Sequence, residues 1–263
     1  MSETPKFTIV TSLIDIGRSN WNELYQRETN LYFFYLSRLL NLDCNFYIFM
    51  DERYIEFFQR LVKDKKNIVI KPISIDKLLM YKHRDRIVQI MKDKNYALST
   101  FDKTHGAITS PELTIPEYNI VVNSKVDLVK RVSEENPFNS DYFIWIDAGY
   151  GHGKIDIPQK WTPPLTDKIG LLCLKDANTI PQDYELFFKQ HVDIVNGGFF
   201  CCNKNNIQEY YDLYYNVVET SLNKGITDDD QYTVSICYSN NKNLFSTIVN
   251  PNWYCLFNDG LNF

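Results

Sequence analysis

An aspartate at the end of an apolar run is the first residue whose surroundings indicate chemistry. Asp147 directly follows the run from Tyr142 to Ile146, and Ala148 and Gly149 come after it. A carboxylate in this place suits a divalent cation, which takes oxygen ligands and can bridge a diphosphate. Small residues also allow a ligand to approach the backbone closely. We therefore predict a ligand site at Asp147; the alternative is that Asp147 only caps a turn that the glycines shape.

The run Asn196-Gly197-Gly198 is a second candidate, because it interrupts an otherwise apolar segment. Glycines inside a strand remove side chains that would normally pack, so another group can come close to the backbone. The alternative is a β-bulge or a hairpin turn, which Asn-Gly pairs favour. The run predicts either a close approach to the strand or a local irregularity in it.

A third candidate is the acidic run Asp228-Asp229-Asp230, which lies between Thr227 and Gln231. Acidic residues in the first turn of a helix are stabilised by the helix dipole, and Thr or Asp makes a good N-cap. Capping by Thr227 or Asp228 would explain one or two of these residues. Because adjacent carboxylates repel one another, capping alone does not explain the whole run. We therefore expect a functional carboxylate at Asp230, with Asp229 as the alternative.

Alternating strands and helices are predicted to position these residues. Apolar runs separated by helical periodicity favour right-handed βαβ units and a mostly parallel sheet flanked by helices. Strands are expected at 7–13, 46–50, 67–73, 142–146, 168–174 and 194–200. Helices are expected from about residue 20, from the second strand to about 63, and at 75–93, 120–135 and 207–222. The first helix prediction rests on Asn20 and Glu23, which have the form of a capping box.

Length, charge and hydropathy limit the class of protein. A chain of 263 residues is long enough for one large α/β domain, although two small domains are also compatible with it. The net charge of −5 argues against a general nucleic-acid binder. No run approaches the ~20 apolar residues that span a bilayer, and the N-terminus lacks the layout of a signal peptide. We therefore expect a cytoplasmic protein, either free or peripheral to a membrane, with reduced cysteines.

The order of the three motifs resembles that of glycosyltransferases of the Rossmann-like GT-A type. Within that group the chain is most similar to the bacterial HtrL/YibB-like family, whose members share a signature of the Ile-Asp-Ala-Gly type, here Ile146 to Gly149. The resemblance extends from Thr8 to about Asn252 and includes Asn123-Ser124-Lys125. It implies a single GT-A domain over residues 1–263, with a nucleotide-binding half at about 1–150 and a sugar and acceptor half at about 151–263.

The resemblance also implies a metal site that this sequence only partly provides. In GT-A enzymes an Asp-X-Asp motif holds Mn²⁺ or Mg²⁺ on the donor diphosphate. Here the motif is Asp147-Ala148-Gly149, so its second carboxylate is missing. His152 or Asp259 would have to complete the site, and Asp147 with His152 is the predicted ligand pair.

The remaining roles that the resemblance implies concern the donor and the acceptor. Asp230 and Gln231 would meet the donor sugar or the acceptor hydroxyl, and Asn196 to Gly198 would line the sugar pocket. Lys125 could contact the diphosphate, and the alternative is a solvated lysine on a helix. Thr11 and Asp15, after the first strand, would contact the nucleoside; Arg18 would either help there or lie on an exposed loop. The implied donor-binding residues are Thr11, Asp15, Arg18, Lys125, Asp147, Ala148, Gly149, Asn196, Gly197, Gly198 and Gln231.

The expected function is transfer of a monosaccharide from a nucleotide diphosphate sugar to an acceptor hydroxyl. A UDP-sugar is the expected donor, and a glycan, lipid-linked or protein molecule the expected acceptor. One alternative is a catalytically silent homologue that binds a sugar or a nucleotide. The other is a sugar nucleotidyltransferase, whose usual glycine-rich, lysine-containing loop after the first strand is absent from Thr11-Ser12-Leu13-Ile14-Asp15.

Overall fold

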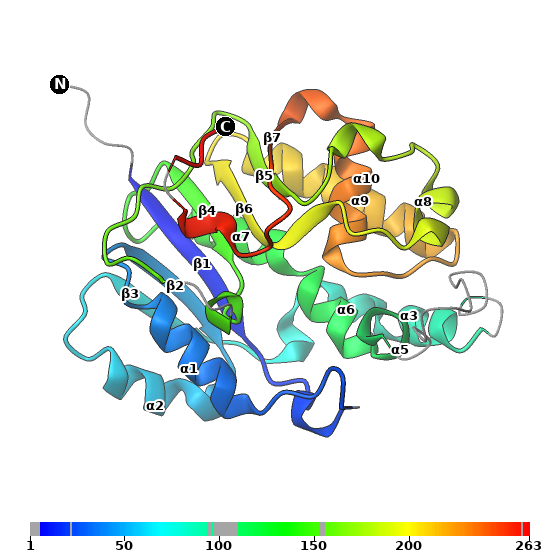
Figure 1. Cartoon of the computed structure of the whole chain (residues 1–263). Coiled ribbons are helices and arrows are strands. Elements are labelled where there is room, and N and C mark those ends of the chain that lie inside the picture. The colour runs from blue at the N-terminus through cyan, green and yellow to red at the C-terminus, as the bar shows by residue number, and fades with distance from the viewer. Residues whose placement is uncertain (1–5, 22, 94–95, 97–109, 153–155, 259) are drawn as a thin grey trace.

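The computed structural model describes residues 6–21, 23–93, 96, 110–152, 156–258 and 260–263. In this part of the chain a seven-stranded sheet runs through the molecule, in the order β3-β2-β1-β4-β6-β5-β7 (Figure 1). Its strands are β1 Phe7–Leu13, β2 Asn45–Met50, β3 Ile68–Pro72, β4 Tyr142–Ile146, β5 Ile169–Cys173, β6 Val195–Asn203 and β7 Phe245–Val249. Both predicted halves of the chain contribute strands to this sheet.

Helices cover both faces of the sheet (Figure 1). They are α1 Thr29–Leu39, α2 Glu52–Leu61, α3 Arg84–Met91, α5 Pro111–Thr114, α6 Pro116–Val122, α7 Lys125–Glu135, α8 Tyr184–Gln190, α9 Ile207–Asn223 and α10 Asp230–Asn240. Along β4, Ile144 and Ile146 pack with α1 and α2, whereas Phe143 and Trp145 pack with α7 and α9. Burial on both faces explains why this strand is apolar throughout.

The strand directions confirm the predicted α/β class. β1 is parallel to β2 and to β4, β2 is parallel to β3, and β5 is parallel to β7. β6 runs antiparallel to both of its neighbours, β4 and β5. The chain leaves β1 for β2 and β3 on one side and then returns to β4 on the other side. The strand order therefore reverses between β1 and β4, which makes this edge a switch point where ligands bind in open α/β sheets.

The predicted bounds of β1 and β4 are confirmed, but the predicted helix from about Asn20 is wrong. Arg18–Asn20 forms one turn of 3-10 helix after Gly17, which has a positive φ of 72°. The backbone N–H of Arg27 bonds to the carbonyl of Arg18, so this segment folds back on itself instead of continuing as a helix. The α-helix begins only at Thr29.

Further elements differ from the sequence prediction. The helix expected at 120–135 is two helices, because α6 ends at Val122 and α7 begins at Lys125. The expected helix at 75–93 begins as two 3-10 segments separated by Leu78, whose backbone is extended, and α3 starts only at Arg84. Helix α8 was not predicted, although Asp183 caps it by accepting from the backbone N–H of Leu186. The sequence analysis also does not predict strand β7, which lies at the end of the sheet and in which only Phe245 of the five residues is buried. The described residues include no helix long and apolar enough to cross a membrane.

Candidate functional site

A cleft of ≈ 390 Å³ opens at the carboxyl ends of β1 and β4. The segment from Ser12 to Ile16 lines one wall, and Trp145 and the segment from Asp147 to Gly149 line another. The cleft thus lies at the reversal of strand order, and its volume is that of a small-molecule site. The fold brings the predicted ligand segment to the place where such sheets bind ligands.

Asp147 is held at the floor of this cleft by its neighbours on the sheet. Its backbone N–H donates to the carbonyl of Gly198 on β6 at 3.1 Å, and its own carbonyl accepts from the N–H of Tyr150 at 2.8 Å. The indole N–H of Trp145 donates to Asp147 Oδ1 at 2.7 Å. The side chain remains 38% exposed, so it is available to a ligand while one oxygen is fixed.

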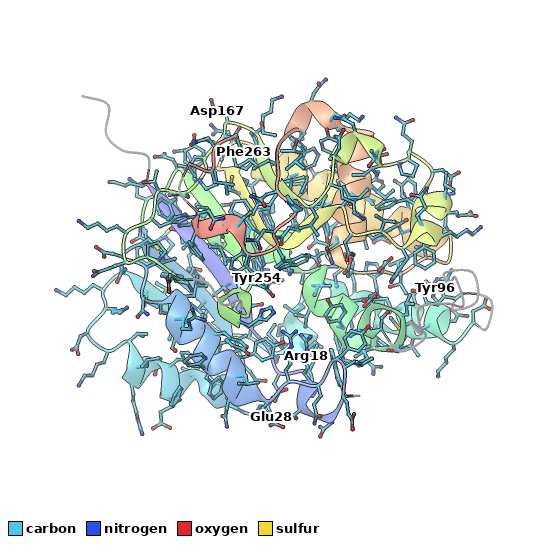
Figure 2. All side chains as sticks on the ribbon, viewed as in Figure 1. Arg18, Glu28, Tyr96, Asp167, Tyr254 and Phe263 are labelled. Atoms are coloured by element: carbon cyan, nitrogen blue, oxygen red, sulfur yellow. The ribbon has the colours of Figure 1, made fainter. Side chains whose placement is uncertain are left out.

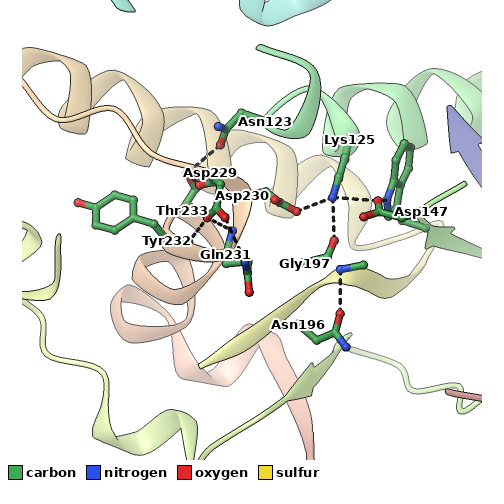
Figure 3. Close-up of polar contacts among 12 residues, drawn as sticks. Asn123, Lys125, Asp147, Asn196, Gly197, Asp229, Asp230, Gln231, Tyr232 and Thr233 are labelled. Carbon is green, nitrogen blue, oxygen red and sulfur yellow. Dashed lines mark hydrogen bonds and ion pairs between the residues drawn. The ribbon is translucent and has the colours of Figure 1, made fainter. Parts of the chain in front are cut away.

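The ammonium group of Lys125 lies between Asp147 and Asp230 and joins them (Figure 3). Lys125 Nζ lies 2.9 Å from Asp147 Oδ1 and 2.8 Å from Asp230 Oδ2, and it donates to the carbonyl of Gly197 at 2.8 Å. These three contacts match the three protons of an ammonium group. Burial lowers the pKa of Lys125, but the two carboxylates outweigh burial and raise the pKa above its ordinary value. The buried lysine is therefore charged at neutral pH.

Asp229 and Asp230 have different roles at the start of α10. Asp229 is the N-cap, and its Oδ1 accepts from the backbone N–H groups of Gln231 at 2.9 Å and Tyr232 at 3.2 Å. Asp230 points instead toward Lys125 (Figure 3). Burial raises the pKa of Asp230 to about 6, against the lowering effect of Lys125, and burial with the charge of Asp230 raises the pKa of Asp229 to about 8. The cap is therefore neither Thr227 nor Asp228.

The glycine at 197 allows this contact between β6 and α10. A Cβ at Gly197 would lie 2.9 Å from Asp230 Oδ2 and 2.9 Å from Gln231 Cγ. Asn196 bonds on both sides of the strand, because its Nδ2 donates to the carbonyl of Trp253 and its Oδ1 accepts from the N–H of Gly198. The close approach that the sequence indicated is made by a carboxylate of the protein itself. The local irregularity that was the alternative is present as well, because the pairing of β6 with β5 shifts register between Leu171 and Cys173.

Asn123 fixes the distance between α7 and α10. Its Oδ1 accepts from Tyr214 OH on α9 and from Thr233 Oγ1 on α10, each at 2.8 Å. Its Nδ2 donates to the carbonyl of Asp228 at 2.8 Å. The residue two positions before Lys125 therefore holds the helix that carries Asp230.

The segment after β1 forms the opposite wall. Asp15 Oδ1 accepts from the backbone N–H of Gly17 at 2.8 Å, and its Oδ2 accepts from Tyr54 OH at 2.6 Å. This turn presents Arg18, whose Nε donates to the carbonyl of Tyr25 at 3.0 Å and whose Nη1 donates to Tyr32 OH. Figure 2 shows Arg18 near the carboxyl end of β1.

His152 is held by two neighbours at the rim. Its Nδ1 lies 2.8 Å from the carbonyl of Gly149, which can only accept, so Nδ1 carries the proton. Its Nε2 then accepts from Tyr254 OH. Burial lowers the pKa of His152, which keeps the ring neutral. Both ring nitrogens of the predicted metal ligand are therefore already engaged.

The side chains at Asp147 do not fit a cation held by the protein. The described residues contain no group of three or more His, Cys, Asp or Glu side chains that could hold a metal ion. The ammonium of Lys125 lies against Asp147 Oδ1, where it repels a second cation. Asp259, the other predicted partner, lies outside the described residues. The Mn²⁺ or Mg²⁺ dependence stays a prediction.

Most of the predicted site residues line the cleft, but three do not. Thr11 is fully buried within β1, Asn196 is buried against Trp253, and Asp229 is occupied as a cap. The predicted residues that line the cleft are Asp15, Arg18, Lys125, Asp147, Ala148, Gly149, His152, Gly197, Gly198, Asp230 and Gln231.

The sequence prediction missed one cation and most of the aromatic rim. Arg27 lines the cleft because the helix predicted around it does not form. The missed aromatic residues are Tyr32, Tyr54, Tyr118, Trp145, Tyr150, Trp253 and Tyr254. The only signal for them was the aromatic share of 15%, which does not indicate position.

Fold and cleft together define an α/β protein with a cleft at the switch point of its sheet. The chain belongs to the HtrL/YibB family, described as a bacterial protein of unknown function, whose family model matches residues 5–259. The predicted family is thus confirmed. Protein HtrL of Escherichia coli (strain K12) is 29% identical over 265 residues, which cover 95% of this chain and 90% of that protein. The crystal structure of mouse xyloside xylosyltransferase 1 in its apo form matches with a TM-score of 0.43 and 11% identity, covering 93% of this chain and 84% of that one.

Proposed function

We propose that this protein is a glycosyltransferase that moves a monosaccharide from a nucleotide diphosphate sugar to an acceptor hydroxyl. A UDP-sugar is the proposed donor, and a glycan, lipid-linked or protein molecule the proposed acceptor. The observation that carries the proposal is the cluster of Lys125, Asp147 and Asp230 at the floor of the switch-point cleft. Two carboxylates on one buried cation form a polar centre that the sheet and α10 hold in place.

The chemistry of the transfer requires two groups that this cluster supplies. The bond from the anomeric carbon to the diphosphate oxygen breaks, a bond to the acceptor oxygen forms, and the acceptor proton needs a base. Asp230, with a pKa of about 6, is ionised at neutral pH and lines the cleft. A carboxylate so placed can take that proton. If the anomeric configuration is retained, the same carboxylate would instead stabilise the oxocarbenium-like state.

Lys125 acts on this base indirectly, as a positioning residue. Its charge lowers the pKa of Asp230, against the burial that raises it. Its bond to the carbonyl of Gly197 keeps the ammonium on β6. Asp147, which is the more exposed carboxylate, is proposed to accept hydrogen bonds from the hydroxyl groups of the donor.

Incubation of the protein with a panel of nucleotide sugars tests this proposal. Release of nucleoside diphosphate that is lost in Asp230→Asn and kept in Asp85→Asn, a change on the exposed face of α3, would support it. Binding without release would favour a silent homologue. Formation of pyrophosphate from a nucleoside triphosphate and a sugar phosphate would favour a nucleotidyltransferase.

A further inference from the structure

Two arginines of the segment after β1 line the cleft together with Asp147. Arg18 and Arg27 come from either end of this fold-back, and the N–H of Arg27 bonds to the carbonyl of Arg18 at 3.3 Å. Both side chains are half-buried. The guanidinium of Arg18 lies over the rings of Trp21 and Tyr32, 5.1 Å and 5.7 Å from their centroids.

Neither arginine is neutralised by a carboxylate in the part of the chain that the structure describes. The ion pairs within 4.0 Å include none for Arg18 or Arg27, whereas Lys125 has two carboxylate partners. The polar contacts of Arg18 are to a neutral carbonyl and a neutral phenol. Two cations without an ion-pair partner in one cleft favour the binding of an anion there.

The charges of both arginines act on the same side chains of the cleft. Burial raises the pKa of Tyr32, and the charges of Arg18 and Arg27 act against that rise. The pKa of His152 is lowered by burial and further by the charges of Arg27 and Arg18. Arg27 also acts to lower the pKa of Tyr254, which burial raises. Both guanidinium groups therefore act on the part of the cleft that Tyr32 and His152 line.

We propose that Arg18 and Arg27 bind the diphosphate of the donor, so that two guanidinium groups meet the charge of the leaving group instead of a cation held on Asp147. This inference rests on the proposed function. Guanidinium groups present several fixed N–H donors that match phosphate oxygens, and they remain charged at any pH that the protein tolerates. Donors placed where negative charge develops stabilise the transition state.

The arrangement around Asp147 explains why the arginines take this role. Lys125 already neutralises that carboxylate, and the second carboxylate of an Asp-X-Asp motif is replaced by Gly149. The turn at Asp15 and Gly17 fixes Arg18 before a ligand arrives, because Tyr54 holds Asp15 from α2. Little ordering is then needed on binding.

Calorimetric titration in EDTA tests the site, with UDP, inorganic pyrophosphate and uridine as probes. We expect the wild-type protein to bind UDP and pyrophosphate without metal. Arg27→Gln and Arg18→Gln should each raise the Kd for both by about tenfold or more, since each removes charged hydrogen bonds. The Kd for uridine should not change. Arg60→Gln, which removes an exposed arginine paired with Glu56 on α2, is the matched control.

Two binding results would overturn the inference. One is binding of UDP that requires MnCl₂ and is restored by it alone. The other is an unchanged Kd for pyrophosphate in Arg27→Gln; this variant keeps the test open should Arg18→Gln fail to fold. If Arg18→Gln and Arg27→Gln turn over the nucleotide sugar at the wild-type rate, this inference is wrong and the proposed function stands. If pyrophosphate binding depends on Arg27 but the protein turns over no nucleotide sugar, the proposed function is wrong and the anion site stands.

Discussion

Lys125 Nζ lies 2.8 Å from Asp230 Oδ2, in a contact that joins the first residue of α7 to the first residue of α10. The two residues are 105 positions apart in the chain. The contact holds the buried carboxylate of Asp230 at the cleft. Lys125 lowers the pKa of this carboxylate and so favours its charged form.

Replacement of Lys125 by Met should destabilise the protein by about 3–5 kcal/mol, because it leaves the buried carboxylate of Asp230 without its cation. The measurement is urea unfolding at pH 7. Lys77→Met is the control, since Lys77 is exposed and its ion pair is with the neighbouring Asp76. Equal unfolding midpoints for the two variants would show that the cluster does not stabilise the fold.

The two aspartates at the start of α10 should respond differently to substitution. Asp229→Ala removes the N-cap and should cost about 0.5–2 kcal/mol of stability, while Asp229→Asn should keep the cap. Asp230→Asn should lower kcat by about a hundredfold or more, the scale of losing a positioned base. Melting temperature and kcat are measured for all three variants. An active Asp230→Asn variant beside an inactive Asp229→Asn variant would reverse the assignment.

Stability should fall as the pH rises from about 4 to about 8. The pKa of Asp229 is raised from 3.8 to about 8 in the folded protein, so the folded state binds more protons than the unfolded state in this range. The stabilisation is complete below about pH 4 and is lost as the pH passes the folded pKa. Melting curves should show a shallower decline in Asp229→Asn. A decline of the same slope in both proteins would exclude Asp229 as its source.

Activity should rise with pH through about 6 as Asp230 loses its proton. Burial holds the pKa of Asp230 near this value, against the lowering effect of Lys125. The pH profile of kcat/KM reports the free enzyme's essential base. In Lys125→Met, if it folds, the rising limb should move to higher pH. A profile that does not move would mean that another group sets the limb.

The sequence predicts the part of the site that rests on local pattern. β4 is a continuous run of apolar and aromatic residues with a sharp end, so the position of Asp147 at a strand end follows from the sequence pattern. The Asn-Gly-Gly run correctly indicates a close approach. The group that approaches Gly197 is the carboxylate of Asp230, and no local sequence pattern predicts this contact.

The rest of the site depends on tertiary contacts that periodicity does not encode. Asn20 and Glu23 match a capping box, yet Gly17 takes a left-handed conformation and the segment folds back to join Arg27 to Arg18. Arg27 therefore lines the cleft instead of lying on a helix. The N-cap of α10 is Asp229, one residue after Asp228, the nearer of the two expected caps. Asp229 and Asp230 therefore have different roles.

The rate of nucleotide-sugar turnover by Asp147→Ala tests the central claim most directly. The side chain lies at the strand end in the cleft, and Lys125 keeps its contacts with Asp230 and Gly197 in the variant, so the fold should be retained. We expect turnover of the donor to be abolished, and Asp147→Asn to be nearly as inactive because the amide keeps the shape and loses the charge. A folded Asp147→Ala protein that turns over the donor at the wild-type rate would contradict the assignment of this cleft as the donor site.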